Sequence, residues 1–214
     1  MKIKPWIIFL IAGLLLVADQ ISKIIVKLTM TLGESYGVIG KWVQIYFIEN
    51  PGAAYGMALD ADWGKLALSL FRVALSILLV IYIRHLYKHK APTGVIVAFI
   101  AIFAGAIGNL FDSAFYGMIF SESTTHTVAH WTEFGQGYTT FLHGKVVDMI
   151  HCPVIQIERL PDWVPLWGGE PFEFFSPVFN LADSYISVAV IYLILFQRKY
   201  FSDKPVDAAE SKAQ

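Results

Sequence analysis

The chain has 214 residues, of which 56% are hydrophobic and only 15% charged, and its mean hydropathy is +0.57. A soluble domain is about 45–50% apolar and about 25% charged, so this composition predicts a polytopic membrane protein built as one domain. With a formal net charge of −1, the chain lacks the basic excess typical of proteins that bind nucleic acid. Cys152 is the only cysteine, which excludes an intrachain disulfide and a cysteine-based metal cluster.

The first apolar segment follows Lys2 and Lys4 and covers residues 6–26. Its early part has the length of a signal-peptide core, but Asp19 and Gln20 stand where a cleavage site would need small residues. We therefore predict a retained first membrane span of about 20 residues.

Three further apolar segments predict three more spans, at residues 66–83, 95–111 and 178–196. Basic clusters lie before the first span, between the second and third, and behind the fourth, where Arg198 and Lys199 stand. By the positive-inside rule, both termini are then cytoplasmic. The fold class that we expect is a membrane all-α domain of four transmembrane helices over residues 1–201, followed by a polar cytoplasmic tail at residues 202–214.

Two stretches, residues 27–65 and residues 113–176, lie outside these spans on the extracytoplasmic side. Residues 41–48 are rich in aromatic and β-branched side chains, which predicts a small β-sheet on the membrane surface. Residues 49–56 follow with a proline, two glycines and Asn50, a composition typical of a turning loop, here expected to face the substrate. In the second stretch, residues 161–167 suit an interfacial position, and Ser176-Pro177 is predicted as the N-cap and first residue of the last helix.

Apart from Arg72, the conspicuous polar residues of the spans fall at their predicted outer ends. A carboxylate costs a few kcal/mol in the membrane, so these residues are expected to face protein or water and to have a function. Any one of them could simply join helices, but their position on one side favours a common site. They are Asp19, Lys23, Asn109, Asp112, Asn180 and Asp183, and Gly105 shares a helix face with Asn109 and Asp112.

One function compatible with this cluster is an intramembrane aspartic hydrolase. Two adjacent carboxylates cannot both ionise, so one stays protonated as an acid while the other activates water as a base. Asp19, Asp112, Asp148 and Asp183 are the candidates, and spacing alone does not select the pair.

Two alternatives remain open at this level. A metalloprotease would use His126 and His130 at i and i+4, with His143 and His151 behind them, but Thr127 occupies the position of the Glu in an HExxH motif. A transporter would need polar groups near mid-membrane. Only Arg72 lies notably deeper, and we expect it to pair with one of the aspartates.

Five motifs, in order, resemble those of the bacterial lipoprotein signal peptidases (signal peptidase II). They cover all four predicted spans and are Asp19-Gln20 with Lys23, Glu49–Gly56, Gly105–Asp112, Val146–Ile150 and Phe179–Ser184.

The resemblance implies an intramembrane aspartic endopeptidase whose catalytic residues are Asp148 and Asp183, without a metal or another cofactor. It implies that prolipoproteins, the lipid-modified partners, are cut on the N-terminal side of the diacylglyceryl-modified cysteine, in the bacterial cytoplasmic (inner) membrane, with the active site on the outer face. Membrane lipid is a further expected partner, and nucleic acid is not. The residues implied to bind substrate or support the site are Asp19, Lys23, Asn50, Gly52, Asn109, Asp112 and Asn180.

The chain departs from the family pattern in two respects. Ser113 stands where the family usually has an arginine directly after the third motif, and Arg72 or Lys145 is a candidate to replace that charge. Residues 113–145 and 151–176 also form longer connections than usual, and the sequence assigns them no role.

Overall fold

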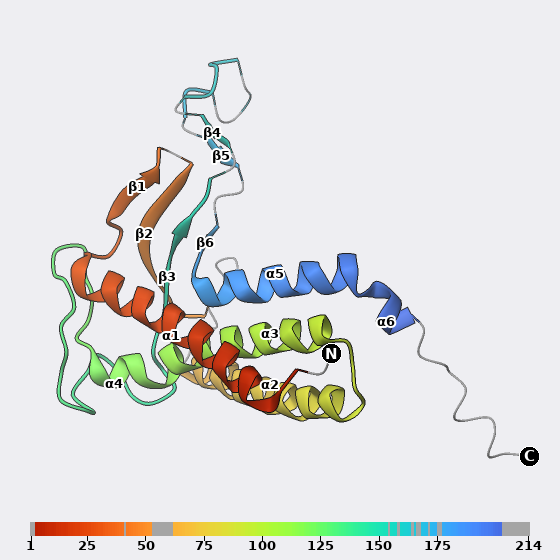
Figure 1. The fold of residues 1–214 in the computed structure, drawn as a ribbon. Coiled ribbons are helices and arrows are strands. Elements are labelled where there is room, and N and C mark those ends of the chain that lie inside the picture. The colour runs from red at the N-terminus through yellow and green to blue at the C-terminus, as the bar shows by residue number, and fades with distance from the viewer. Residues whose placement is uncertain are drawn as a thin grey trace, which may run out of the picture.

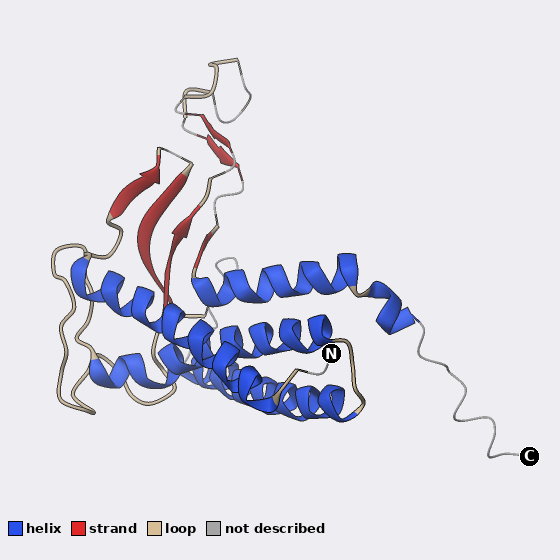
Figure 2. Cartoon of the chain, in the orientation of Figure 1, coloured by secondary structure: helices blue, strands red, loops and turns tan. Residues whose placement is uncertain are grey.

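The structure is a computed structural model that describes residues 3–40, 42–52, 62–153, 155–157, 159–163, 165, 168–170, 172–174 and 177–202. Its helices form one bundle, called here the helical layer, and its strands stand at one end of that bundle (Figures 1 and 2). In chain order the elements are α1 (Pro5–Thr29), β1 (Ser35–Ile39), β2 (Val43–Asn50), α2 (Asp62–Lys88), α3 (Thr93–Phe111), the π-helix η1 (Asp112–Tyr116), α4 (Gly117–Ile119), β3 (Val146–His151), β4 (Ile155–Ile157), β5 (Phe172–Phe174), β6 (Val178–Phe179), α5 (Leu181–Phe196) and α6 (Arg198–Ser202).

Helix α3 is the centre of the helical layer and packs against α1, α2 and α5. Its two glycines at the sheet end permit this close packing. A Cβ atom on Gly105 would lie 2.4 Å from the carbonyl oxygen of Ala182, and one on Gly108 would lie 2.5 Å from Asp19 Oδ2. Small residues at helix interfaces let backbones approach closely, so the Gly-Ala-Ile-Gly-Asn sequence brings α1 and α5 together over α3.

Among the described residues, three helices are long and apolar enough to cross a membrane, namely Pro5–Thr29, Trp63–Lys88 and Thr93–Ile119. Large apolar side chains such as Phe9, Phe71 and Leu195 are exposed on the outside of the layer, as expected for a surface in contact with lipid. The fourth apolar helix, α5, has 16 residues and is about 24 Å long, shorter than the roughly 30 Å of a bilayer core.

Helix α5 begins later than the sequence predicted. Residues 178–179 form strand β6, and Asn180 is the N-cap, so the predicted start at residue 178 and the assignment of Ser176-Pro177 as cap and first helical residue are wrong; Ser176 itself lies outside the described residues. The Asn180 side chain accepts from the Asp183 backbone N–H, and the Asp183 side chain accepts from the Asn180 N–H. This capping box satisfies two backbone donors and fixes Asp183 in the first turn.

The helical path of α3 does not end at Phe111, as the sequence predicted, but continues through η1 and α4 to Ile119. Ala114 and Tyr116 are buried in this continuation, so burial of this face favours helix where an extramembrane segment was expected. The π-turn falls at Asp112, and such turns occur frequently at functional sites.

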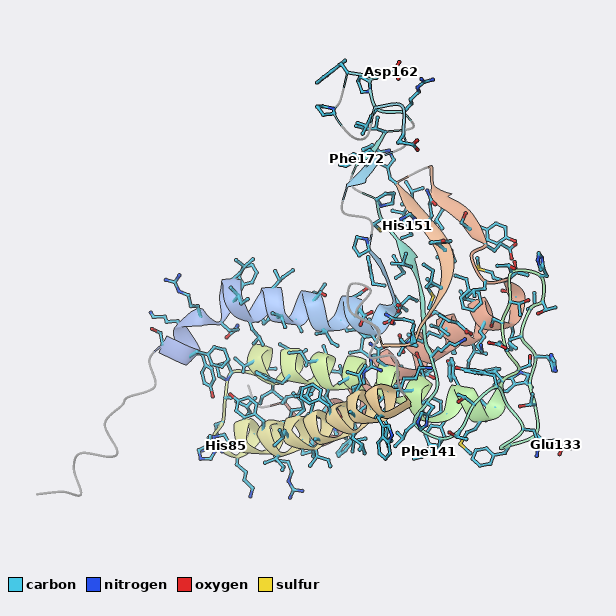
Figure 3. All side chains as sticks on the ribbon, turned by 180° about the vertical axis from the view of Figure 1, so that it is seen from behind. His85, Glu133, Phe141, His151, Asp162 and Phe172 are labelled. Atoms are coloured by element: carbon cyan, nitrogen blue, oxygen red, sulfur yellow. The ribbon has the colours of Figure 1, made fainter. Side chains whose placement is uncertain are left out.

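The sheet has the strand order β1-β2-β3-β6 with antiparallel neighbours. The predicted strand at residues 41–48 is confirmed as β2, which runs on to include Glu49 and Asn50 rather than leaving them in a loop. Residue Ile48 pairs with Asp148 in β3, and Asn50 pairs with Val146. Strands β4 and β5 form a separate hairpin that projects beyond the sheet, with Asp162 near its tip (Figure 3).

Residues 120–145, called here the 120–145 loop, pack beside the C-terminal end of α1 and beside α4 (Figure 1). The backbone N–H of Leu32 donates to the Thr124 carbonyl at 2.9 Å, and the Gly144 N–H donates to the Ser113 carbonyl at 2.8 Å. A Cβ atom at Gly144 would lie 2.3 Å from the Asp112 carbonyl oxygen. Glycine is therefore required where the loop returns to the helices before β3.

Candidate active site

Asp148 lies in β3 and is 4% exposed. Its Oδ1 accepts a hydrogen bond from Asn180 Nδ2 at 2.7 Å, and its Oδ2 accepts one from Asn50 Nδ2 at 3.1 Å. Both donors are neutral amides, so the carboxylate is oriented without being neutralised.

Asp183 lies in the first turn of α5 and is half-buried. Its Oδ1 accepts from Asn109 Nδ2 at 2.8 Å, and its backbone N–H donates to Asn180 Oδ1 at 3.0 Å. Since Asn180 also donates to Asp148, one asparagine side chain joins the two aspartates. The structure thus brings together the four predicted site residues Asp148, Asp183, Asn109 and Asn180.

Burial is the largest influence on the Asp148 carboxyl and raises its pKa to about 6. The hydrogen bond from Asn50 opposes this shift, the negative charge of Asp183 adds to it, and the hydrogen bond from Asn180 again opposes it. Burial disfavours the charged form of a carboxyl, and a second carboxylate nearby does the same. Asp148 is therefore suited to hold a proton near neutral pH.

Asp19 and Asp112 are fully buried and share a cation. The Lys23 ammonium lies 2.9 Å from Asp19 Oδ2 and 2.7 Å from Asp112 Oδ2, and it donates to Asn109 Oδ1 at 2.8 Å. All three ammonium hydrogens have acceptors. Because Asn109 Oδ1 accepts from Lys23, its Nδ2 points to Asp183, and this fixes the orientation of the amide.

The same buried cluster ties three helices together. Asp19 Oδ1 accepts from the backbone N–H of Ala182 in the first turn of α5 at 2.9 Å. Gln20 Nε2 donates to Asp112 Oδ1 at 2.9 Å and to the Gly108 carbonyl at 3.2 Å. Asp19, Lys23 and Asp112 therefore hold α1, the C-terminal end of α3 and the first turn of α5 together, and Asn109 connects this cluster to Asp183.

Gly52 has a left-handed backbone conformation, with φ +93°. Its N–H donates to Asn50 Oδ1 at 2.8 Å, which leaves Nδ2 of that amide facing Asp148. A Cβ atom at Gly52 would also lie 2.4 Å from Leu68 Cδ2. The remaining positions of the second motif, residues 53–56, lie outside the described residues.

Arg72 does not have the carboxylate partner that the sequence predicted. No salt bridge between the described residues includes it; instead Nη1 donates to Ser113 Oγ at 2.7 Å, and that hydroxyl donates to the Asn109 carbonyl at 3.1 Å. Arg72 on α2 thus reaches the position where the family pattern has its arginine. Lys145, the other candidate, pairs with Glu49 and Glu122.

The histidines do not form the arrangement that a zinc protease requires. His126 and His130 lie in the 120–145 loop rather than on a helix, and the His130 ring bonds with Ser121 Oγ at 3.0 Å. Within the part of the chain that the structure describes, no three His, Cys, Asp or Glu side chains are grouped as metal ligands.

Two further residues near the site, Lys27 and Glu49, were not identified as a pair from the sequence. Lys27 is fully buried and forms an ion pair with Glu49 in β2. A signal was present, since Lys27 lies four residues after Lys23 and hence on the same face of an otherwise apolar helix.

Known proteins are similar to this chain over nearly its whole length. The model of the family described as signal peptidase (SPase) II matches residues 11–198. The lipoprotein signal peptidase of Porphyromonas gingivalis is 47% identical over 183 residues, which cover 85% of this chain and 78% of that protein. The lipoprotein signal peptidase of Amoebophilus asiaticus is 31% identical over 211 residues, covering 97% of this chain and 84% of the relative.

A solved bacterial membrane enzyme, determined by the in meso method at 2.3 Å resolution, has the same fold. Its TM-score is 0.61 at 26% identity, and the alignment covers 98% of both chains. The family match and the relatives agree with the five ordered motifs and with the membrane-type helices. The chain therefore belongs to the signal peptidase II family.

Proposed function

We propose that this protein is an intramembrane aspartic endopeptidase that removes the signal peptide from prolipoproteins on the N-terminal side of the diacylglyceryl-modified cysteine. Asp148 and Asp183 are its catalytic dyad. The observation that carries the proposal is the Asn180 side chain, which bonds to the Asp148 carboxylate and to the backbone of Asp183 and so holds both aspartates at one place.

The dyad works with one shared proton. The ionised carboxylate takes a proton from a water molecule whose oxygen attacks the scissile carbonyl carbon, while the protonated carboxyl donates to the carbonyl oxygen. When the tetrahedral intermediate collapses, the C–N bond breaks and the nitrogen leaves with a proton from the dyad. One water is consumed, and a carboxyl and a free amine are formed.

The amide neighbours suit this chemistry because, as neutral donors, they favour the ionised form of a carboxyl less strongly than a cation would. Asn50 and Asn180 contact Asp148, and Asn109 contacts Asp183. A lysine in their place would favour the ionised form of both aspartates and would remove the proton that the mechanism needs.

For the membrane topology we propose four spans, cytoplasmic termini and a site on the outer face of the bacterial inner membrane. The start of α1 and the end of α5 lie at the end of the helical layer opposite the sheet (Figure 1). The basic end of α2, with His85 in Figure 3, lies there too. Since basic residues favour the cytoplasmic side, the sheet and Asp183 fall outside.

The lipid on the substrate fits this position. Each buried methylene contributes about 0.8 kcal/mol of membrane affinity, so two acyl chains keep the modified cysteine at the depth of the dyad. Holding a reactant in place raises its effective concentration. The exposed apolar side chains of α2 and α5, such as Phe71, Leu75 and Ile194, provide a lipid-facing approach.

The test is cleavage of a lipidated prolipoprotein peptide in detergent by Asp148→Asn and Asp183→Asn. Each is expected to lose at least about 10³-fold in turnover, because an amide cannot exchange the proton. Asp162→Asn is the matched control, since that carboxylate is 79% exposed near the tip of the β4–β5 hairpin. Near-normal turnover by either dyad variant in a folded protein would refute the assignment.

A second arm of the same assay compares the lipidated peptide with one that carries an unmodified cysteine. The unmodified peptide should be cut far more slowly in the same micelles. Equal rates would contradict the proposed role of the lipid while leaving the aspartic chemistry intact.

A further inference from the structure

A second buried ionic cluster lies on the other side of strand β2 from the dyad. It consists of Lys27 from α1, Glu49 from β2, and Ser123 and Lys145 from the 120–145 loop, and it is called here the Lys27 cluster. The Lys27 and Glu49 side chains are 0% and 2% exposed. None of these residues contacts Asp148 or Asp183 through a hydrogen bond, and the reaction proposed above does not use them.

Lys27 is held by three kinds of contact. Its ammonium pairs with Glu49 Oε1, donates to Ser123 Oγ at 3.0 Å and lies 5.0 Å from the ring centroid of Tyr138. A buried cation requires such partners, because an unpaired one in this environment would be strongly unfavourable. Ser123 and Tyr138 belong to the 120–145 loop.

Glu49 is held from the same loop on both of its oxygens. Ser123 Oγ donates to Oε1 at 2.9 Å, and the Lys145 ammonium lies 3.2 Å from Oε2. The contact with Lys145 is ionic rather than a well-aligned hydrogen bond, since Oε2 has no hydrogen-bond partner among the described residues. The backbone N–H of Lys145 in turn donates to the Tyr138 hydroxyl at 2.8 Å.

The Lys27 cluster is connected to the dyad through two adjacent residues of β2. Glu49 is followed directly by Asn50, whose Nδ2 donates to Asp148 at 3.1 Å. On the other strand, Lys145 directly precedes β3, which carries Asp148. Pairing of Glu49 with Val147 places both strand ends side by side at this point.

The cluster does not have the features of a second catalytic site. A serine next to a lysine can act as a nucleophile when the lysine is neutral and takes the serine proton. Here the Lys27 ammonium is paired with Glu49, and the Ser123 hydroxyl donates to the same carboxylate. Ser123 is also 3% exposed, which leaves no access for a substrate.

We propose that the Lys27 cluster is a positioning device for catalysis, in which the 120–145 loop holds the end of β2 so that Asn50 stays hydrogen-bonded to Asp148. The inference rests on the proposed role of Asp148. The proposal assigns a function to the 120–145 loop, which is the long connection between α4 and β3. Through Asn50, this loop supports Oδ2 of Asp148, while Asn180 binds Oδ1. Lys27, Glu49, Ser123 and Lys145 are thus positioning residues.

The test uses full-length Lys27→Met and Glu49→Gln in the lipidated-peptide assay, with kcat and KM measured across pH. Misplacement of a catalytic neighbour by about 1 Å can cost about 10²-fold, so we expect kcat to fall by about 10- to 100-fold. KM should change little, because the substrate contacts the dyad and not the cluster.

The pH profile separates positioning from a general loss of structure. The Asn50 hydrogen bond favours the ionised form of Asp148, so losing it raises the pKa of Asp148 and moves the alkaline limb of the profile to higher pH. Asn50→Ala should show the same upward displacement as the cluster variants. The other groups that act on Asp148 are Asn180 and Asp183 from α5, Lys23 from α1 and Arg72 from α2, and these variants leave them all in place.

Glu122→Gln is the matched control, because its carboxylate lies 3.6 Å from the same Lys145 ammonium but is 65% exposed. It should keep the parent kcat and pH profile. If Lys27→Met or Glu49→Gln does not fold, Ser123→Ala keeps both charges and should produce a smaller change in the same direction.

If folded Lys27→Met and Glu49→Gln keep the kcat and the pH profile of the parent protein, the inference is overturned. A lower kcat without a displaced alkaline limb would overturn it as well, because it would indicate a loss unrelated to Asn50. Full activity of Asp148→Asn would instead overturn the proposed function, so the two failures are distinguishable.

Discussion

Two pairs of aspartates lie within the same group of helices and strands, and their surroundings are opposite. Asp19 and Asp112 are fully buried and share the Lys23 ammonium at 2.9 and 2.7 Å. Asp148 and Asp183 are bound by the amides of Asn50, Asn109 and Asn180, and no salt bridge between described residues includes either of them.

The two settings suit the pairs to different roles. The Lys23 ammonium binds Asp19 and Asp112 inside the protein, where an unpaired charge would be strongly unfavourable. Asp148 has no such cation partner among the described residues, and burial raises its pKa to about 6. The first pair therefore joins helices, and the proton transfer proposed above is assigned to the second.

The largest expected effect comes from removing the shared cation. Lys23→Met leaves Asp19 and Asp112 buried without a counter-ion, so we expect a loss of about 3–5 kcal/mol in the free energy of unfolding in detergent. Lys4→Met, at an exposed position before α1, is the control and should unfold like the parent. Parental stability of Lys23→Met would show that the first pair does not depend on its cation.

The contrast between the two pairs also predicts how the stability of the protein depends on pH. The pKa of Asp148 in the folded protein is about 6, above its ordinary value of 3.8. Well below pH 3.8 the group is protonated in both states and carries no cost. Between pH 3.8 and 6 the unfolded state ionises while the folded state keeps its proton, so the folded state loses up to about 3 kcal/mol of stability, and this loss is complete above pH 6.

Asp148→Asn cannot titrate and should lack this component, so the stability difference between parent and variant should change between pH 4 and 7. Unfolding midpoints measured across that range check it, with Asp162→Asn retaining the parental dependence. The same pH dependence in Asp148→Asn and in the parent would contradict the raised pKa.

We expect a smaller effect at Arg72, whose charge interacts with aspartates of both pairs. Arg72→Met removes the hydrogen bond to Ser113 Oγ, and we expect a loss of about 1.5–3 kcal/mol because the donor is charged. Thermal unfolding measures it, with the exposed Arg84→Met as control. Full stability of Arg72→Met would show that this bond only accompanies the packing of α2 on α3.

The amino-acid sequence alone was enough to predict the membrane class, the approximate helices and a set of candidate site residues. Long apolar runs specify helices that can cross a membrane, because their backbone groups must bond within the segment. The five motifs were recognisable because residues such as Asp19, Asn109 and Asp183 stand at fixed positions relative to those runs. Strand β2 was also predictable, since its aromatic and β-branched residues favour extended backbone.

The partners of these residues depend on the tertiary structure. Spacing along the chain could not show that Lys23 pairs with Asp19 and Asp112 while Asp148 is bound by asparagine amides, because the contacts join segments far apart in sequence. It also could not reveal that Asn180 follows a short strand, β6, and caps α5, because asparagine suits several kinds of position outside helices. The partners of Lys27 depend on the packing of the 120–145 loop beside β2, and the partner of Arg72 depends on the packing of α2 on α3. Local sequence does not specify these neighbours, and the burial and pairing of a charge depend on them.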